Sequence, residues 1–479
     1  MVFNSFTFII FLPVVVAIYY ALPVRMRYIW LLGASYFFYM SWEAIYGLLL
    51  LYSTAAAFAG GLVLSKYRGG RCQKAYLALF LSLVFAPLVF FKYTGFLCDN
   101  LNSLFLSMGA IAPFDPPEIT LPIGISFFTF QAAGYVIDVY RGTVEKERNF
   151  LRFALFVSFF PQLVAGPIER TKNLLGQLDC NVSFDFERAR DGLWLMLWGF
   201  AMKVVVANRI AIFVDRVYDD CYTYGGVYLI IASMLFAMQI YCDFAGYSTI
   251  AIGAAKIMGI KLMDNFASPY NSCSVSDFWR RWHISLTSWF KDYVYIPLGG
   301  NRKGKVREYI NKLFVFALSG LWHGAEWSFV VWGALNGLWL VLEDALKPLA
   351  TSFVRKALGG LLTFVLVDLA WIFFRAATIE DALYIIGSIF HTSNWSALFD
   401  GSITLCGLDA ANLVLLAAMI ALIFTVDALA LSGIHIRQKL ASLPLWMRSL
   451  VTAAAAAFIL LFGIWGGTYA PEAFIYFQF

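Results

Sequence analysis

Long apolar runs constrain the fold of this 479-residue chain more than any other feature. A run of about 20 apolar residues is long enough to cross roughly 30 Å of hydrocarbon as a helix. The runs lie near residues 6–22, 28–42, 44–64, 76–96, 121–140, 191–212, 226–242, 313–330, 331–346, 358–375, 411–432 and 449–467. Hydrophobic residues make up 61% of the chain and charged residues 14%, against roughly 45–50% and about 25% in a soluble domain. We therefore expect an all-α polytopic membrane protein with about 10–12 transmembrane helices.

The distribution of Lys and Arg over the loops predicts an orientation in the membrane. Basic residues follow the first and third runs, whereas none occurs between Lys92 and Arg141 or between Arg375 and Arg437. Under the positive-inside rule the first set of loops is cytoplasmic, which places the N-terminus outside. No Lys or Arg precedes Arg25, so we interpret the first run as a transmembrane helix of a multi-pass protein in the cytoplasmic (inner) membrane. The net charge of +5 reflects this loop bias and does not indicate nucleic-acid binding.

The chain shows no composition shift that would separate a soluble domain. We predict one membrane domain over 1–479, with N-terminal helices in 1–140, a core in 141–345 and C-terminal helices in 346–479. Charges, Pro and Gly interrupt the hydrophobicity most strongly in 141–190 and 261–312. Irregular backbone at membrane depth is tolerated only where it is buried in protein or lines a cavity, so a reaction chamber is expected in these two segments.

The densest group of reactive side chains follows Ser276, which is predicted to cap a helix. Asp277 and Arg281 have the spacing of an ion pair one helical turn apart. On a continuous helix Arg280 and His283 share a face. We favour a functional role for Arg280, Arg281 and His283, because an arginine at bilayer depth costs at least about 2.5 kcal/mol unless it finds an interior partner.

Trp279 and Trp282 add aromatic surface to the same segment. They could line a cavity, or they could anchor an amphipathic helix in the membrane interface. The sequence leaves both interpretations open.

His323 ends an apolar run, and the next charge is Glu326. Desolvation would keep this imidazole neutral, the form that a general base requires; alternatively, the ring could serve as a hydrogen-bond partner between helices. On a continuing helix Glu326 would share the face of His323 and orient it, or it could be a loop carboxylate. Gly320 and Gly324 permit close approach of another backbone or of a ligand.

Several other kinds of site find no support. The cysteines form no C-x-x-C pair and the histidines no H-E-x-x-H pattern, so we predict no metal. His391 and His435 are expected to be solvated surface residues. No phosphate-binding loop, dinucleotide fingerprint or serine-hydrolase elbow occurs, and we predict no bound cofactor.

Five blocks of sequence resemble the membrane-bound O-acyltransferase (MBOAT) family, in its alginate O-acetyltransferase membrane-subunit branch. They are FPQLVAGPIER at 160–170, YCDFAGYS at 241–248, SDFWRRWHISL at 276–286, YIPLGGNR at 295–302 and LWHGAEW at 321–327. The resemblance runs in order from the first residues through Trp327 and is mainly one of hydropathy beyond about residue 345.

The resemblance implies an MBOAT fold with re-entrant or amphipathic helices around a central tunnel. It also implies transfer of an acyl group from a cytoplasmic thioester, with acetyl-CoA as the expected donor. His323 matches the family's catalytic histidine and His283 its second, supporting position. The oxyanion could be stabilised by His283, by Arg280 or by a backbone amide. The candidate substrate- and tunnel-lining residues are Trp279, Arg280, Arg281, Trp282, Trp322, Glu326 and Trp327.

The same branch implies a partner. Its membrane subunits work with an extracytoplasmic protein of the SGNH-hydrolase type that completes transfer to a polysaccharide, and this chain has no Gly-Asp-Ser nucleophile block of its own. We expect such a partner, with membrane lipid around the chain and an alginate-like or peptidoglycan-like glycan as the indirect acceptor. The alternatives are a teichoic-acid D-alanyl transferase that uses a carrier protein, a transporter with a histidine proton relay, and a structural scaffold.

Overall fold

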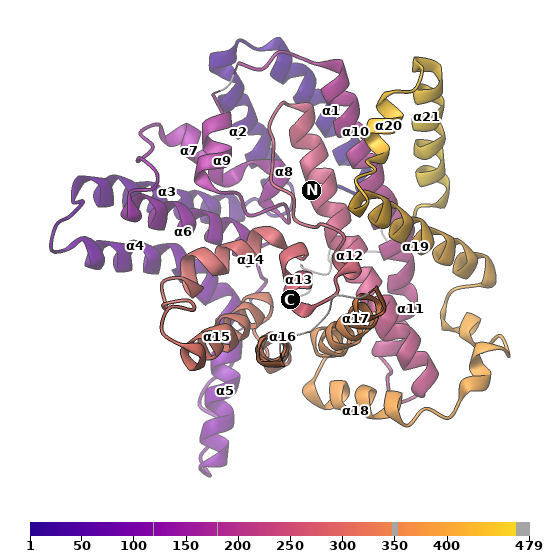
Figure 1. Cartoon of the computed structure of the whole chain (residues 1–479). Coiled ribbons are helices and arrows are strands. Elements are labelled where there is room, and N and C mark those ends of the chain that lie inside the picture. The colour runs from indigo at the N-terminus through magenta and orange to yellow at the C-terminus, as the bar shows by residue number, and fades with distance from the viewer. Residues whose placement is uncertain (118, 180, 347–352, 466–479) are drawn as a thin grey trace. The chain divides into compact units, whose positions relative to one another are not determined.

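The computed structural model describes residues 1–117, 119–179, 181–346 and 353–465, and every regular element within these ranges is a helix (Figure 1). Within these ranges, eight continuous helical stretches are long and apolar enough to cross a membrane, and the shorter helix α1 (Phe6–Ala21) is also apolar. This confirms the expectation of an all-α polytopic membrane protein. The eight spans are Tyr46–Lys66, Gln73–Ser107, Phe186–Tyr218, Gly226–Ile257, Trp327–Leu346, Ala357–Arg375, Ala410–Leu431 and Leu445–Phe462.

The described residues thus hold fewer long apolar helices than the about 10–12 expected from the apolar runs. The runs near 28–42 and 121–140 form α2 (Val24–Met40) and α6 (Ile125–Arg141), which have 17 residues each. The run near 313–330 does not form one helix, because α15 (Lys305–His323) ends inside it. The last two residues of the run 449–467 lie outside the described residues.

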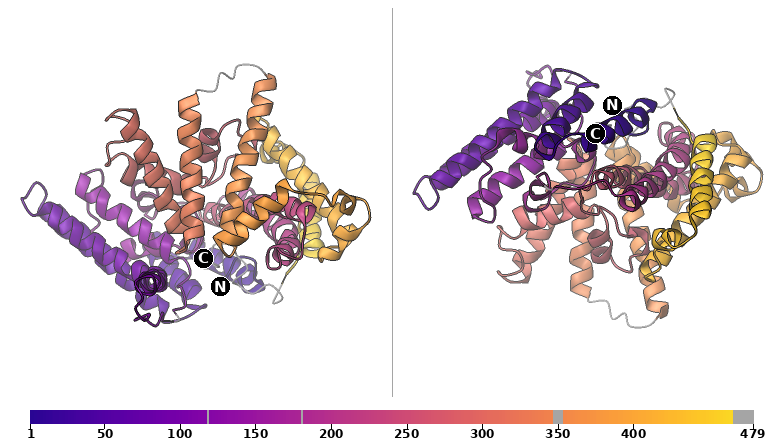
Figure 2. Two further views of the ribbon diagram at one scale, coloured as in Figure 1. Left: turned by 90° about the horizontal axis from the view of Figure 1, so that it is seen from below. Right: turned by 90° about the horizontal axis from the view of Figure 1, so that it is seen from above.

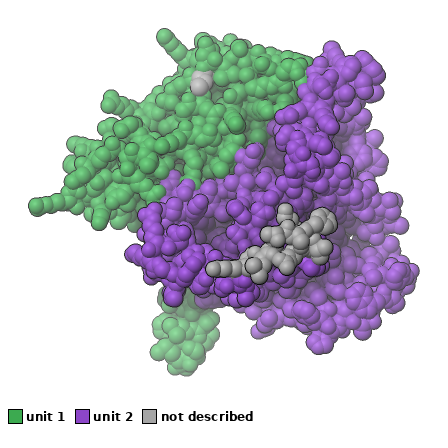
Figure 3. Space-filling model, in the orientation of Figure 1, with its two compact units in different colours: residues 1–193, 251–263 green, residues 194–250, 264–479 purple. Residues whose placement is uncertain are grey.

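The chain divides into two compact units (Figure 3). Unit 1 comprises residues 1–193 and 251–263, and unit 2 comprises residues 194–250 and 264–479. Two helices, α10 (Phe186–Phe200) and α12 (Gly226–Ile257), contribute residues to both units. The single domain over 1–479, with its division at 140 and 345, stays a prediction.

Unit 1 is built around the contacts of α3 with α4 and α6, whose ribbons run side by side in both views of Figure 2. Gly60 and Gly61 on α3 make this packing possible, since a Cβ at Gly60 would lie 3.0 Å from Phe80 and one at Gly61 only 2.3 Å from the hydroxyl of Tyr135. Besides α1, α2 and α6, its elements are α3 (Tyr46–Lys66), α4 (Gln73–Leu88), a π-helical turn (Val89–Tyr93), α5 (Thr94–Ser107), α7 (Phe150–Ser158), α8 (Phe160–Leu163), α9 (Thr171–Leu174) and a 3-10 turn (Leu175–Gln177).

The predicted irregular segment 141–190 contains only short helices before α10 begins. Glu169 ties part of it down: its carboxylate accepts hydrogen bonds from the backbone N–H of Met263, at 2.5 Å, and from the amide of Asn173, at 2.6 Å. Burial raises the pKa of Glu169. The bond to Met263 satisfies a backbone N–H that lies outside any helix.

Unit 2 holds the remaining helices and both of the histidines singled out above. Besides α15, its elements are a π-helical segment (Ala201–Ala207), α11 (Asn208–Tyr218), a 3-10 turn (Pro269–Asn271), α13 (Val275–Arg281), α14 (Ile284–Phe290), a π-helical turn (Lys291–Tyr295), α16 (Trp327–Leu346), α17 (Phe353–Arg375), α18 (Ile379–Phe390), two 3-10 turns (Trp395–Leu398 and Ser402–Cys406), α19 (Ala410–Leu431), α20 (Ile436–Ala441) and α21 (Leu445–Phe462). Helix α16 packs against α13, α15 and α17.

A buried ion pair joins two long helices of unit 2. Lys203 lies in the π-helical segment and Asp243 on α12, both side chains are almost completely buried, and the ammonium contacts the carboxylate. Close to the pair, Gly199 and Gly246 let the two backbones approach, since a Cβ at Gly199 would lie 2.5 Å from the carbonyl oxygen of Gly246. The pair therefore places two opposite charges in contact within membrane-spanning helices.

We predict that Lys203→Met destabilises the protein by about 3–5 kcal/mol, because it leaves the Asp243 charge buried without its cation. The double variant Lys203→Met/Asp243→Leu removes both charges and should recover most of the loss. The measurement is thermal unfolding of the detergent-solubilised protein. A double variant as unstable as the single one would contradict this account.

Candidate functional site

The segment around His283 consists of two short helices and not of the continuous amphipathic helix predicted from Ser276. Helix α13 is capped by Ser274, whose hydroxyl accepts from the N–H of Asp277 at 3.1 Å. It ends at Arg281, Trp282 is extended, and His283 adopts a left-handed conformation with φ of 42° before α14 begins. The prediction of one helix capped at Ser276 is therefore wrong, whereas the Asp277–Arg281 ion pair is confirmed at 3.0 Å.

Backbone hydrogen bonds to residues 265–267 stabilise the non-helical conformation between α13 and α14. The N–H of Ile284 donates to the carbonyl of Asn265 at 2.9 Å, and the N–H of Ala267 donates to the carbonyl of Arg281 at 3.0 Å. They offset a left-handed conformation that costs a non-glycine residue about 1–3 kcal/mol. The break also separates two side chains expected on one face: Arg280 is 72% exposed, but His283 is only 1% exposed.

The second histidine ends a helical hairpin in which two backbones touch. A Cβ at Gly320 would lie 2.1 Å from the carbonyl oxygen of Phe329, and one at Gly333 would lie 2.2 Å from that of Phe316. Only glycine allows helices α15 and α16 to cross this closely. Helix α15 ends at His323 and Gly324 is extended, so the imidazole lies at the turn of the hairpin, and the expected close approach at Gly320 is confirmed.

The two predicted histidines lie together in unit 2. Their ring centroids are 6.3 Å apart and both side chains are buried. The ring of His323 packs against those of Trp322, Trp332 and Phe374, at 4.8, 5.0 and 5.6 Å. The ring of His283 packs edge-on against Phe244 at 4.6 Å. Residues from α12, α15, α16 and α17 thus build one aromatic surrounding for both imidazoles.

This surrounding keeps an imidazole in its neutral form. Burial lowers the pKa of His283 to about 3, so the ring is uncharged at physiological pH and has one N–H donor and one acceptor nitrogen. A neutral imidazole can take up and return a proton without a metal. Among the residues that the structure describes, no three His, Cys, Asp or Glu side chains are placed to share a metal ion; that the protein binds none stays a prediction.

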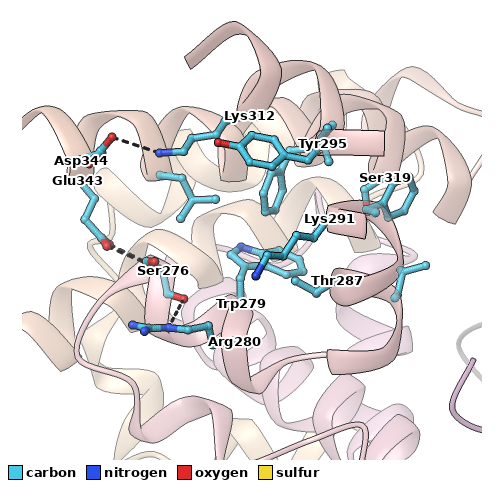
Figure 4. Close-up of a pocket in the computed structure, with 15 residues that line it drawn as sticks. Ser276, Trp279, Arg280, Thr287, Lys291, Tyr295, Lys312, Ser319, Glu343 and Asp344 are labelled. Atoms are coloured by element: carbon cyan, nitrogen blue, oxygen red, sulfur yellow. Dashed lines mark hydrogen bonds and ion pairs between the residues drawn. The ribbon is translucent and has the colours of Figure 1, made fainter. Parts of the chain in front are cut away.

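A cavity of about 630 Å³ lies within unit 2 (Figure 4), lined by residues on both sides of His283 in the sequence but by neither histidine. Its apolar wall comes from α13, α14, α15 and α16, and the lining residue nearest to His323 in sequence is Ser319, one helical turn earlier. Trp279 connects the two regions: its ring lies 5.9 Å from that of Trp332, and its indole N–H donates to Asn336 at 3.2 Å. The volume is in the range of small-molecule sites.

Charged side chains gather at one side of this cavity (Figure 4). Lys312 is engaged by Asp344 at 3.2 Å, and Glu343 accepts from the backbone N–H of Val275 at 2.6 Å. Arg280 and Lys291 differ from Lys312, because both are exposed; Arg280 lies 3.8 Å from Asp277. Of the three cations that line the cavity, these two are the more exposed to an anionic ligand.

The candidate tunnel-lining residues fall into four groups. Trp279 and Arg280 line the cavity, whereas Trp282 and Trp322 are buried in the aromatic packing around the histidines, and Arg281 pairs with Asp277. Glu326 and Trp327 lie in the exposed turn after α15 and at the start of α16.

Glu326 accordingly does not continue the helix of His323. That interpretation is wrong because α15 ends at His323, and the carboxylate accepts instead from the hydroxyl of Ser328 at 3.4 Å. Its alternative, a loop carboxylate, agrees with the structure. His391 and His435 are exposed, as expected.

Sequence reasoning missed Asn265, Lys291, Trp332 and Phe374. The two aromatics lie 9 and 51 residues after His323 and resemble many other aromatic residues of a chain with 18% Phe, Trp and Tyr. Asn265 lies in the irregular segment 261–312 but 18 residues before His283. Lys291 offered one signal, because it directly follows α14, five residues after the block 276–286 that holds the predicted residues.

Comparison with known proteins gives consistent matches. The model of the MBOAT, membrane-bound O-acyltransferase family matches residues 142–379. A probable alginate O-acetylase AlgI of Pseudomonas syringae is 39% identical over 433 residues, covering 88% of this chain and 81% of that protein. A peptidoglycan O-acetyltransferase of Helicobacter pylori is 36% identical over 421 residues, covering 81% and 79%. A teichoic acid D-alanyltransferase of Streptococcus thermophilus is 32% identical over 290 residues, covering 53% and 68%.

We predict that Gly333→Ala destabilises the protein by roughly 1–3 kcal/mol, because the added methyl group meets the Phe316 carbonyl and forces α15 and α16 apart. The matched control is Gly387→Ala in α18, where a Cβ meets nothing within 4 Å; it should be neutral or stabilising by up to about 1 kcal/mol. Thermal unfolding in detergent measures both. Equal stability of the two variants would show that the hairpin contact is not tight.

Proposed function

The chain belongs to the membrane-bound O-acyltransferase family, and from this premise we propose that it transfers acetyl groups from a cytoplasmic thioester for O-acetylation of an extracytoplasmic polysaccharide. Membership and the O-acetyltransferase relatives make it a multi-pass membrane O-acyltransferase. Acetyl-CoA is the proposed donor. The proposed location is the cytoplasmic membrane, with the N-terminus outside.

The observation that carries this proposal is the pair of buried imidazoles together with a cavity that has exposed cations. A transferase of this kind needs a neutral base next to the reacting carbonyl and a place for a thioester carrier. His323 and His283 supply the first, with ring centroids 6.3 Å apart. The cavity bounded by Trp279, Arg280 and Lys291 supports the second.

In the proposed reaction His323 is the general base. It takes the proton of the acceptor hydroxyl while the hydroxyl oxygen attacks the thioester carbonyl, forming a tetrahedral oxyanion. Collapse of this intermediate breaks the carbon–sulfur bond, and the proton on His323 passes to the departing thiolate. An ester and a free thiol result, so the ring returns to its neutral form after each turnover. His283, whose ring centroid lies 6.3 Å from that of His323, is the supporting residue of this step.

The cavity suits the two ends of a coenzyme A thioester. Trp279, Phe290 and Phe316 offer apolar surface to the extended arm of the donor. Arg280 and Lys291, both exposed, offer positive charge to its phosphate groups, and an arginine can bind phosphate with two parallel hydrogen bonds. The donor would then lie with its phosphates at the charged side and its acyl end toward Ser319.

The polysaccharide and the partner follow from the relatives. Two of them are named for O-acetylation of alginate and of peptidoglycan, and we propose an acceptor of this class, an alginate-like or peptidoglycan-like polysaccharide. We further propose an extracytoplasmic partner of the SGNH-hydrolase type that completes the transfer. The D-alanyl alternative has weaker support, because the teichoic acid D-alanyltransferase matches only 53% of this chain. Family membership favours an enzyme over the transporter and the scaffold.

We predict that His323→Ala lowers acetyl transfer at least about 100-fold, the usual contribution of a general base. The assay follows radiolabel from acetyl-CoA to the partner protein or polysaccharide in membranes that contain both proteins. His435→Ala, at an exposed position, is the matched control and should retain full activity. Transfer that persists in His323→Ala would remove this residue from the chemistry.

We predict that Arg280→Gln and Lys291→Gln each raise the KM for acetyl-CoA at least about tenfold, because a lost hydrogen bond to a charged group costs roughly 1.5–3 kcal/mol. The KM for acetyl-pantetheine, which has no phosphate, should stay unchanged. Lys439→Gln, an exposed lysine on α20, is the control. Equal effects on the two donors would mean that the cations do not bind phosphate.

A further inference from the structure

We propose that Asn265 is the positioning residue of the second histidine: it holds His283 in the tautomer that has its proton on Nδ1 and leaves Nε2 as a hydrogen-bond acceptor. This inference rests on the proposed function for the role of His283 in the reaction. The tautomer itself is independent of that role. Asn265 belongs to none of the five blocks of the sequence that resemble the family, and it lies 18 residues before His283.

The hydrogen bonds of Asn265 decide which end of its amide faces the histidine. The side-chain oxygen lies 3.2 Å from the backbone nitrogen of Ser285, 2.8 Å from the hydroxyl of Ser285 and 3.2 Å from Nδ1 of His283. A backbone N–H can only donate, so the amide atom that faces it must be the oxygen. The amide nitrogen points the other way and donates to the hydroxyl of Ser248 at 3.2 Å.

The state of the imidazole follows from this orientation. An amide oxygen can only accept, so Nδ1 of His283 must donate to it and must carry a proton. In a neutral ring the other nitrogen, Nε2, then has a lone pair and accepts. Asn265, Ser285 and Ser248 are all almost completely buried, so water does not compete for these bonds.

The same residue also holds the backbone of the histidine. The carbonyl of Asn265 accepts from the N–H of Ile284 at 2.9 Å, one residue after the left-handed His283. Asn265 therefore bonds to the backbone of Ile284 through its main chain, and to the His283 ring and Ser285 through its side chain. A buried amide with its bonds satisfied at both ends gives a ring a single orientation.

This tautomer narrows the role of His283. With its proton on Nδ1, a neutral His283 cannot donate from Nε2 to an oxyanion, although the sequence left that role open. Nε2 can instead accept from an O–H or N–H group, such as the hydroxyl of the acceptor or a protonated His323. The geometry thus assigns His283 to orienting a proton donor, and stabilisation of the oxyanion falls to another group.

Nitrogen NMR of the full-length protein in detergent tests the tautomer directly. The chain has four histidines, so ¹⁵N-histidine labelling gives few signals, and loss of one set in His283→Gln assigns them. We expect a protonated Nδ1 and an unprotonated Nε2 for His283 at neutral pH. A protonated Nε2 with an unprotonated Nδ1 in the wild type would overturn the proposal.

Two substitutions of Asn265 separate the side-chain bond from the fold. Asn265→Asp keeps an oxygen acceptor and should keep the proton on Nδ1, whereas Asn265→Leu removes the acceptor and should produce a population protonated on Nε2. Asn336→Leu is the matched control, because Asn336 is also buried and bonds to Trp279 instead; it should leave the His283 signals unchanged. A folded Asn265→Leu protein with the wild-type tautomer would overturn the proposal.

Kinetics test the consequence for the reaction. In Asn265→Leu we expect kcat for acetyl transfer to fall about tenfold or more, with KM for acetyl-CoA within about twofold of wild type, since donor binding is not touched. Asn265→Asp should retain more activity than Asn265→Leu, and the reverse order would count against a positioning role. If the wild type itself transfers no acetyl group, the proposed function fails, while the NMR result still decides the tautomer.

Discussion

The backbone pairing between residues 265–267 and 281–284 is the interaction on which the rest of the site depends. It provides hydrogen-bond partners for the N–H of Ile284 and the carbonyl of Arg281 where helix α13 stops. Such partners are needed because backbone polar groups in a membrane protein must be paired within the protein. Without it the segment would continue as one helix, and His283 would share a face with the exposed Arg280. With it, His283 turns into the protein while Arg280 remains at the cavity.

The second histidine depends on a different constraint, the absence of side chains at Gly320 and Gly333. The close crossing of α15 and α16 places the turn of the hairpin, and so His323, among rings from three helices. The two imidazoles are thus positioned by different interactions: His283 by hydrogen bonds, and His323 by the backbone contact between α15 and α16. Their common aromatic surrounding excludes water, which strengthens every polar interaction inside it.

At the cavity, one short helix presents both a buried apolar side chain and an exposed charged one. Trp279 and Arg280 are neighbours in sequence, but the first packs toward Trp332 and the second is exposed at the charged side. One helix can therefore contact an apolar arm and an anionic end of the same ligand. This arrangement agrees with a thioester carrier more closely than with a small neutral substrate, and it links the proposed donor site to the histidines through the indole of Trp279.

The sequence by itself determined the membrane class, the helical fold and the segment that holds His283 and His323, because apolar runs and rare ionisable residues in them are properties of composition and spacing. Tertiary structure alone decided that the helix breaks at His283, that Glu326 lies in a turn and that Asn265 meets the imidazole. Those outcomes depend on hydrogen bonds and backbone contacts between residues 9 to 19 positions apart. Local periodicity predicted a continuous helix at the break. It could not predict the break, because the strain at His283 is offset by hydrogen bonds to residues 265–267, which lie outside the periodic segment.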